Sequence, residues 1–409
     1  MRSKLTLCGL TVLIALAANG CGSASNTYTN QTIVGTPQTI VRTSQQIQQS
    51  AQSLGQKVAQ WQIKQLEDDN YDYLAERYHN SSSNPLGWIQ AAFYIGLTRW
   101  VETVNDRNAF AHIEKMAQEQ DYQLLLKRPM HADDHAIGQT FLWLTEQTGN
   151  QEAYKPTKKM FDKILAAPPK VSLEMIDEQP RRRGFEGACQ DRWCWSDALF
   201  MAPRTWLKLS NITGDNRYFD YADKEYWATV DYLFSEKHGL FFRDSRYFDK
   251  KSDNGKPVFW SRGNGWVFAG LPLIIDDLSK EHPSRQRYIE LYKRYAAALQ
   301  AIQKPNGYWS PSLLDPNKVK TPETSGTAFI IFGLAWGVNN GILTDAKYKT
   351  SVLKGWQAIE KATQANGKVN WVQQVGKSPD PVSEHETQFY GAGAVLLAAS
   401  EMTKWKEEQ

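Results

Sequence analysis

The sequence predicts an all-α protein that folds as an (α/α)6 barrel, a closed ring of six helical hairpins in a single domain. Two repeated patterns support this fold. One helix ends at Gly149 and another at Gly214; each glycine follows a Thr and precedes a Tyr that belongs to the next helix. This is the pattern of a glycine that caps a helix before the chain restarts. The second pattern is a glycine turn followed by a short extended segment, at Gly239, Gly307 and Gly367.

Both patterns recur at intervals of roughly 60 residues, a period typical of a helical hairpin repeated around a closed toroid. Residues 56–409 have room for six such hairpins. An irregular helical bundle is the alternative. In a barrel, the loops that precede the inner helices open on one face, so we expect the functional residues to gather there.

Residues 1–21 have the features of a lipoprotein-type signal peptide. Two basic residues precede an apolar run, Leu5–Ala18, which is too short to span a membrane comfortably. The run leads to Cys21 in a sequence similar to a bacterial lipobox, so Cys21 is the expected lipidation site. Cleavage by ordinary signal peptidase is the alternative, because asparagine replaces a small residue of that box. We expect an outer-membrane lipoprotein of a Gram-negative bacterium, facing the periplasm or the cell surface and held only by its N-terminal lipid.

Residues 22–55 are rich in Ser, Thr, Gln and Asn and are interpreted as a flexible tether, so the folded catalytic domain is expected over residues 56–409, beginning near Gln56. Its hydrophobic content, 41% of 409 residues, is ample for a large core. The net charge of +3 gives no basic surface for nucleic acid. The 15 Trp and 18 Tyr favour a carbohydrate-binding surface, although these residues also fill cores.

Two cysteines, Cys189 and Cys194, stay in the mature chain apart from the lipidation site. In an oxidising compartment they can pair and close a small loop. Two free, half-buried thiols are the alternative. No Cys and His spacing suggests a zinc site.

The candidate general acid is Asp197. It follows Trp195 and precedes an apolar helical run. Desolvation in such surroundings disfavours the charged carboxylate and raises the pKa, which suits a proton donor near neutral pH. An Asp that pairs with an Arg or caps a helix is the alternative.

Other polar motifs also lead into apolar helices. Residues 131–135 bring two histidines, His131 and His135, next to two acids, Asp133 and Asp134; an N-cap at a helix dipole explains one acid but not both. Residues 260–266 place an arginine between tryptophans, and its planar fork suits a carboxylate. Neutralisation of a nearby Asp is the alternative for that arginine. In residues 322–327 a helix cap at Thr324 or Ser325 is favoured over a functional Glu323. Tyr390 lies in a further loop that enters a helix.

Taken together, these motifs resemble the unsaturated glycuronyl hydrolases of glycoside hydrolase family 105, which are related to family 88. The matching segments run in the order of that family over about residues 85–400: 131–135, 195–203, 242–245, 260–266, 322–326 and 390–391. The resemblance implies an (α/α)6 barrel that acts on an anionic partner, the unsaturated oligosaccharide left by a polysaccharide lyase.

The implied reaction is hydration of the C4=C5 enol ether of the terminal 4,5-unsaturated uronic acid, without metal or cofactor. Asp197 corresponds to the acid/base residue, and Asp134, or alternatively Asp133, to an assisting acid. The resemblance gives the remaining site residues substrate-binding roles; they are His131, His135, Trp195, Arg243, Trp260, Arg262, Trp266, Glu323 and Tyr390.

Arg243 departs from the family, where many members carry a histidine. This departure leaves two types of leaving fragment open, the rhamnogalacturonan type and a sulfated, ulvan type. A cation at this position favours an anionic neighbouring sugar. The alternative functions are another (α/α)-toroid glycosidase, a polysaccharide lyase, or an outer-membrane glycan-binding lipoprotein without enzymatic activity. The protein is expected to be a monomer or a homodimer.

Overall fold

The computed structural model describes residues 42–176 and 187–406, so the signal segment with Cys21 lies outside the described residues. The first helix, α1 (Ser44–Glu67), starts with a capping box at Thr43. It buries Ile47, Ala51 and Leu54 against the rest of the domain. This corrects the predicted tether, which extends too far: the chain is already folded at Ser44, well before Gln56.

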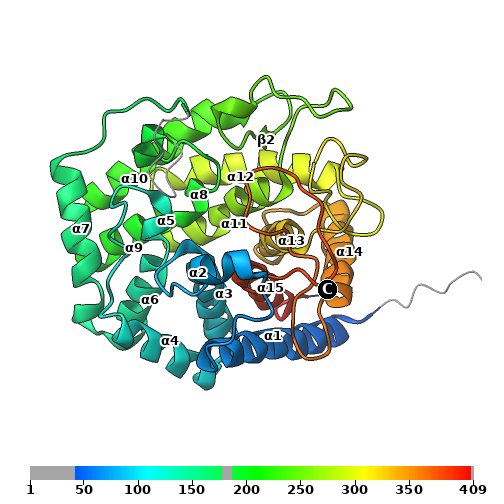
Figure 1. Cartoon of the computed structure of the whole chain (residues 1–409), viewed down its shortest axis with the longest axis horizontal. Helices are drawn as coiled ribbons and strands as arrows, with labels where there is room; N and C mark the ends of the chain where they lie inside the picture. Colours follow the sequence, from blue (N-terminus) through cyan, green and yellow to red (C-terminus); the bar gives the residue numbers. More distant parts are fainter. Residues whose placement is uncertain (1–41, 177–186, 407–409) are drawn as a thin grey trace, which may run out of the picture. The chain divides into compact units, whose positions relative to one another are not determined.

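Six helices form the inner ring of a barrel (Figure 1). They are α3 (Trp88–Val104), α6 (Gly138–Thr148), α9 (Pro203–Thr213), α11 (Ser261–Asp277), α13 (Thr324–Asn339) and α15 (Phe389–Met402). Each contacts the next, and α15 returns to contact α3, so the ring is closed. Within the described ranges this confirms the predicted (α/α)6 barrel.

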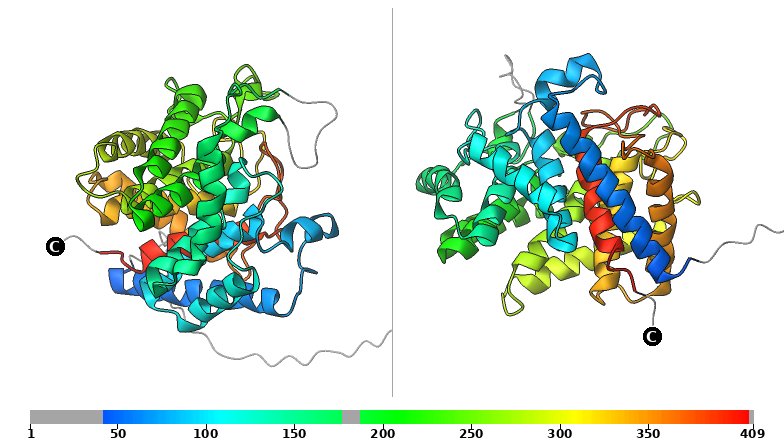
Figure 2. Two further views of the ribbon diagram at one scale, coloured as in Figure 1. Left: turned by 90° about the vertical axis from the view of Figure 1, so that its left-hand side faces the viewer. Right: turned by 90° about the horizontal axis from the view of Figure 1, so that it is seen from below.

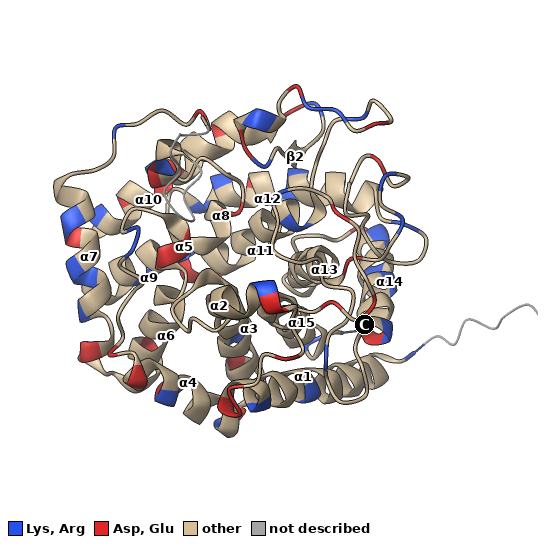
Figure 3. Ribbon diagram, in the orientation of Figure 1, with Lys and Arg blue, Asp and Glu red and all other residues tan. Residues whose placement is uncertain are grey.

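The outer ring covers these helices (Figure 2). It consists of α1, α4 (Arg107–Glu119), α7 (Lys155–Ala166), α10 (Asn216–Leu233), α12 (Arg285–Ala301) and α14 (Ala346–Ala362). Figure 3 shows charged residues along outer helices such as α7 and α14, whereas α13 has none. Residues 324–337 of α13 and all of α15 are buried. Burial on all sides explains why α13 and α15 are almost uniformly apolar, whereas an outer helix such as α7 buries only one face.

The repeats seen in the sequence have the expected structures. Gly149 follows α6 and Gly214 follows α9, both with φ of 71°, the left-handed conformation that ends a helix. The turn at Gly239 joins two short antiparallel strands, β1 (Phe234–Ser235) and β2 (Leu240–Phe241), in which Phe234 pairs with Phe241. Helix ends and turns thus recur as the sequence predicts.

The ring closes where α3 and α15 approach each other closely. A Cβ atom on Gly393 would lie 2.2 Å from the carbonyl oxygen of Ala92, and one on Gly96 would lie 2.2 Å from that of Gly393. Glycine is required at both positions because any side chain would push the two helices apart. α1 packs on α15 at the same seam, where the Gln48 amide donates to the Trp405 carbonyl oxygen over 2.6 Å.

Short helical elements in the loops shape one end of the barrel. They are η1 (Glu76–Tyr78), α2 (His79–Ser82), α5 (Ala132–His135), η3 (Ala188–Arg192), α8 (Ala198–Met201) and η4 (Ser245–Tyr247). A further short element, η2 (Gln151–Ala153), follows the C-terminus of α6. Several of these elements carry residues of the cavity described below. In the part of the chain that the structure describes, no helix is long and apolar enough to cross a bilayer.

Candidate active site

A cavity of about 1030 Å³ opens among the loops that precede the inner helices. Predicted residues that line it are His131, Asp133, Trp195, Asp197, Arg243, Trp260, Arg262 and Trp266. Residues that the sequence analysis did not single out also line it, among them Trp88, Lys127, Arg128, Gln190 and Lys377. Segments far apart in the sequence therefore meet at the end of the barrel where the repeat placed the functional loops.

Asp197 lies at the N-cap position of α8, with 14% of its side chain exposed. Ser196 Oγ donates a hydrogen bond of 3.1 Å to Asp197 Oδ2, and Arg243 Nε lies 4.0 Å from the same oxygen. Burial raises the pKa of Asp197, and the positive charges of Arg243 and Arg262 oppose that rise. Asp197 is therefore an acid that keeps its proton to higher pH than an exposed aspartate, as predicted from its apolar surroundings.

The two adjacent acids of α5 have different environments. Asp133 lines the cavity with 17% of its side chain exposed, and burial raises its pKa to about 7 although Arg128 acts against the rise. Asp134 is fully buried and is held by Arg128, whose Nη2 donates to Oδ1 over 2.6 Å and whose backbone N–H donates to Oδ2 over 2.9 Å. The structure thus places Asp133, not the preferred Asp134, on the cavity.

The two histidines also differ. His131 lines the cavity and packs against Trp195, with ring centroids 4.6 Å apart and the ring planes tilted by 43°. Burial and the charge of Arg128 lower the pKa of His131 well below its ordinary value, so its ring is neutral. His135 lies behind the wall, where Nε2 donates to the Pro129 carbonyl oxygen over 2.8 Å and Nδ1 accepts from Trp206 over 3.3 Å. His135 therefore supports the fold of this loop and does not face the cavity.

Arg243 reaches the cavity from the loop after β2. Its Nη1 donates to Asp244 Oδ2 over 2.6 Å, and Arg246 binds the same carboxylate through two bonds of 2.9 Å. One carboxylate is thus shared by two guanidinium groups. The backbone carbonyl of Arg243 accepts from the N–H of Ser196 over 2.8 Å, which fixes Arg243 beside the Asp197 segment.

Arg262 is buried between two aromatic rings, 4.4 Å from the centroid of Trp260 and 4.7 Å from that of Tyr390. Its Nη1 and Nη2 donate to the carbonyl oxygens of Gln373 and Gln374 over 2.6 and 2.8 Å. The fork that the sequence assigned to a carboxylate is therefore occupied by backbone, and Nε alone lacks a hydrogen-bond partner among the described residues. Arg262 therefore contributes positive charge to the cavity and does not form the predicted two-point contact with a carboxylate.

Glu323 and Tyr390 lie behind the cavity wall. Glu323 itself caps α13 by accepting from the backbone N–H groups of Ser325 and Gly326 at 3.0 and 2.7 Å, so a helix cap is present but neither Thr324 nor Ser325 provides it. The ring of Tyr390 stacks on Trp88 with centroids 5.5 Å apart. Trp266 reaches the cavity while packing 4.2 Å from the Phe329 ring centroid. Motif residues thus divide into those that line the cavity and those that hold its wall.

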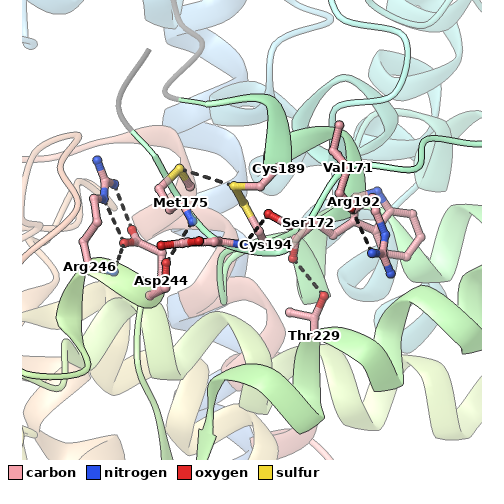
Figure 4. The surroundings of a disulfide bond; sticks show 12 residues. Val171, Ser172, Met175, Cys189, Arg192, Cys194, Thr229, Asp244 and Arg246 are labelled. Atoms are coloured by element: carbon pink, nitrogen blue, oxygen red, sulfur yellow. Dashed lines mark hydrogen bonds and ion pairs between the residues drawn. A yellow bond between two sulfur atoms is a disulfide. The ribbon is translucent and has the colours of Figure 1, made fainter.

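Cys189 and Cys194 form a disulfide bond, so of the two predicted alternatives the structure has the paired one (Figure 4). The loop they close contains Gln190 and directly precedes Trp195, both of which line the cavity. It is anchored from behind, because Thr229 Oγ1 donates to the Trp193 carbonyl oxygen over 2.9 Å. The disulfide therefore fixes the backbone that leads into the Asp197 segment.

Replacing both cysteines with alanine is expected to lower the free energy of unfolding by about 2 kcal/mol, the loop-closure contribution of so short a disulfide loop. Urea unfolding of the wild type and the double variant measures the difference. A reducing agent serves as the control. It should lower the free energy of unfolding of the wild type to that of the variant and leave the value for the variant unchanged. Equal stability of the oxidised wild type and the variant would contradict this contribution.

A cavity walled by tryptophan, with buried acids of raised pKa and balancing arginines, is suited to acid–base chemistry on an anionic sugar. At the end of an (α/α)6 barrel this combination defines a glycoside hydrolase. A family model described as Glycosyl Hydrolase Family 88 matches residues 54–406, so the chain belongs to that family.

The chain is 58% identical over 356 residues to an unsaturated 3S-rhamnoglycuronyl hydrolase of Alteromonas sp. (strain LOR), covering 87% of this chain and 86% of that protein. A protein of the same description from Formosa agariphila is 35% identical over 334 residues, covering 79% and 86%. A family 88 glycosyl hydrolase structure from Bacteroides vulgatus has a TM-score of 0.72 at 24% identity, covering 88% of this chain and 99% of that one. The relationship expected from the motifs is confirmed.

Proposed function

We propose that this glycoside hydrolase removes the 4,5-unsaturated uronic acid from lyase-generated oligosaccharides in which the next sugar is a sulfated rhamnose, as in ulvan fragments. Hydrolysis of an unsaturated uronic acid follows from the family and from relatives at 58% and 35% identity. The sulfated neighbour is the finer part of the proposal. It is supported by the names of both relatives, in which we take 3S to mean a sulfate on the rhamnose, and by the cation at Arg243.

The observation that carries the mechanism is the mostly buried Asp197 at 4.0 Å from Arg243 on the cavity wall. In the proposed reaction the protonated Asp197 gives its proton to C4 of the enol ether, and C5 takes up the positive charge. Water adds to C5 and returns one proton to the Asp197 carboxylate. The resulting hemiketal opens, the bond to the neighbouring sugar breaks, and a 5-keto sugar is released. Burial favours this step because it keeps the acid neutral before transfer.

Asp133 is proposed as the assisting acid, in place of Asp134, because it lines the cavity. With its pKa raised to about 7 by burial, Asp133 is protonated below that pH. A neutral Asp133 adds no negative charge beside the uronate and can donate a hydrogen bond to the reacting sugar or water. Arg262 supplies compensating positive charge for the uronate carboxylate from the cavity wall.

The assay uses a purified unsaturated disaccharide with a sulfated rhamnose at its reducing end. Wild-type enzyme is expected to abolish the ultraviolet absorbance of the conjugated double bond, because hydration destroys it. Release of the free rhamnose sulfate should keep pace with that loss. An increase of absorbance on the intact polymer would instead identify a lyase, and tight binding without any absorbance change would identify a binding protein.

Arg243→Gln is expected to lower kcat/KM on the sulfated disaccharide about tenfold more than on its unsulfated counterpart, since a hydrogen bond to a charged group is worth about 1.5–3 kcal/mol. Steady-state kinetics on both substrates measures the ratio. Arg246→Gln is the matched control, because Arg246 shares the Asp244 carboxylate but does not line the cavity. Equal losses on both substrates in Arg243→Gln would exclude Arg243 as the sulfate contact.

A further inference from the structure

Three predicted binding residues converge on one backbone segment, Gln373–Gln374, behind the cavity wall. The carbonyl oxygen of Gln373 accepts from Arg262 Nη1 and from the Tyr390 hydroxyl, both over 2.6 Å. Its N–H donates to Glu323 Oε1 over 3.2 Å. Their hydrogen bonds therefore fix this segment of the chain and are not directed at substrate.

The side chain of Gln373 extends this network to the cavity itself. Its Oε1 accepts from Trp260 Nε1 over 2.9 Å, and its Nε2 donates to the Ser378 carbonyl oxygen over 2.7 Å. Gln373 is 2% exposed and does not line the cavity, whereas Trp260 does. One buried amide thus joins a tryptophan of the wall to the rim, defined as residues 375–378.

The rim forms part of the cavity, since Val375, Gly376 and Lys377 all line it. At its far side the Tyr247 hydroxyl donates to the Lys377 carbonyl oxygen over 2.9 Å. The rim is thus held from one side by Tyr247 and from the other by Gln373. Loss of the Gln373 amide would release one of these two supports and leave the buried indole N–H of Trp260 without an acceptor.

We propose that Gln373 is a positioning residue for substrate binding: its amide sets the Trp260 indole and the rim at the distance that the bound oligosaccharide requires. Nothing in the local sequence marks Gln373, because its role depends on five partners from four separate segments. The inference rests on the proposed function for its substrate, but the geometry that carries it does not involve the reacting acids.

Gln373→Met keeps the volume of the side chain and removes both hydrogen bonds. We expect KM for the unsaturated disaccharide to rise about tenfold while kcat changes less than about twofold, because binding geometry is altered and Asp197 is not. Gln374→Met is the matched control. The Gln374 amide is also buried and bonded twice, to the Thr387 carbonyl oxygen over 3.1 Å and to Gln388 over 2.9 Å, on a network that excludes Trp260.

A merely structural role would lower the unfolding temperature in both variants and leave both KM values unchanged, and this result would overturn the proposal.

Trp260→Phe removes the same hydrogen bond from its other end. If Gln373 acts through Trp260, the double variant should raise KM by less than the product of the single effects. Multiplicative effects would contradict the proposal. If Gln373→Met fails to fold, Trp260→Phe alone provides the test, since an unchanged KM would overturn it.

Limited trypsin digestion adds a readout that needs no substrate. Cleavage after Lys377 should be faster in Gln373→Met than in the wild type or in Gln374→Met, because the Ser378 carbonyl has lost its donor. Equal cleavage rates would mean that Gln373 does not hold the rim. Absence of turnover by the wild type would contradict the proposed function alone, and the digestion would still decide whether Gln373 holds the rim.

Discussion

Replacing Asp197 with asparagine is expected to lower kcat by roughly a hundred- to ten-thousandfold, the range that general acid catalysis contributes. Asparagine has the same shape, and the hydrogen bond from Ser196 can be kept, so the unfolding temperature should stay close to that of the wild type. The loss of ultraviolet absorbance on the unsaturated disaccharide measures the rate. A variant that keeps more than about a tenth of the activity would exclude Asp197 as the proton donor.

Ser196→Ala serves as the control for this assignment. The Ser196 hydroxyl favours the charged form of Asp197, so its removal should raise the pKa of Asp197 further. The acid form then persists to higher pH, and the alkaline limb of the kcat profile should move upward. Activity near neutral pH should be largely retained. A downward shift of that limb would mean that a different group gives up the proton.

Replacing Asp133 with alanine is expected to lower kcat/KM about a hundredfold, comparable to the loss of one hydrogen-bond donor from an active site. Asp133→Asn should keep most of the activity at neutral pH, because its amide is neutral and can donate. The wild type should lose kcat/KM as pH rises through about 7, where Asp133 becomes charged and repels the uronate. Asp133→Asn should lack this limb, since its amide does not ionise.

The neighbouring acid provides the contrast. Asp134→Asn removes the buried carboxylate that accepts from the Arg128 guanidinium and backbone N–H, and the loss of these charge-assisted bonds should lower the free energy of unfolding by about 1.5–3 kcal/mol. Equal inactivity of Asp133→Asn and Asp133→Ala would mean that Asp133 itself transfers a proton. A fully stable but inactive Asp134→Asn, with an active Asp133→Ala, would return the assisting role to Asp134.

The barrel could be predicted because its repeating helices end at residues that local sequence patterns identify. Gly149 and Gly214 stop helices for a backbone reason that no tertiary contact is needed to supply. The start of the domain could not be placed as well. α1 is rich in Gln and Ser like a tether, and its buried stripe of Ile47, Ala51 and Leu54 is sparse. Such a stripe becomes decisive only when a partner, here α15, packs against it.

Part of the candidate site could also be predicted from local signals in the sequence. Apolar neighbours marked Asp197 as a buried acid. The spacing of the two cysteines allowed a disulfide but did not decide between bonded and free thiols. Which of two adjacent acids faces a cavity is a different question, because successive residues of a helical turn point about 100° apart. Arg128 decides it by holding Asp134. Arg128 and Gln373 themselves carried no signal, since each acts through partners that are distant in sequence.

The glycine seam between α3 and α15 has a consequence for how the protein is made. The first and last inner helices complete each other, so the surfaces of α1 and α3 that pack on α15 have no partner while the chain is still being synthesised. The ring can close only after Phe389–Met402 has left the ribosome. Until then the nascent chain is an open arc with exposed apolar surface, the form most prone to aggregate and the one that chaperones would meet. The last helix is thus the segment whose arrival allows the whole barrel to close.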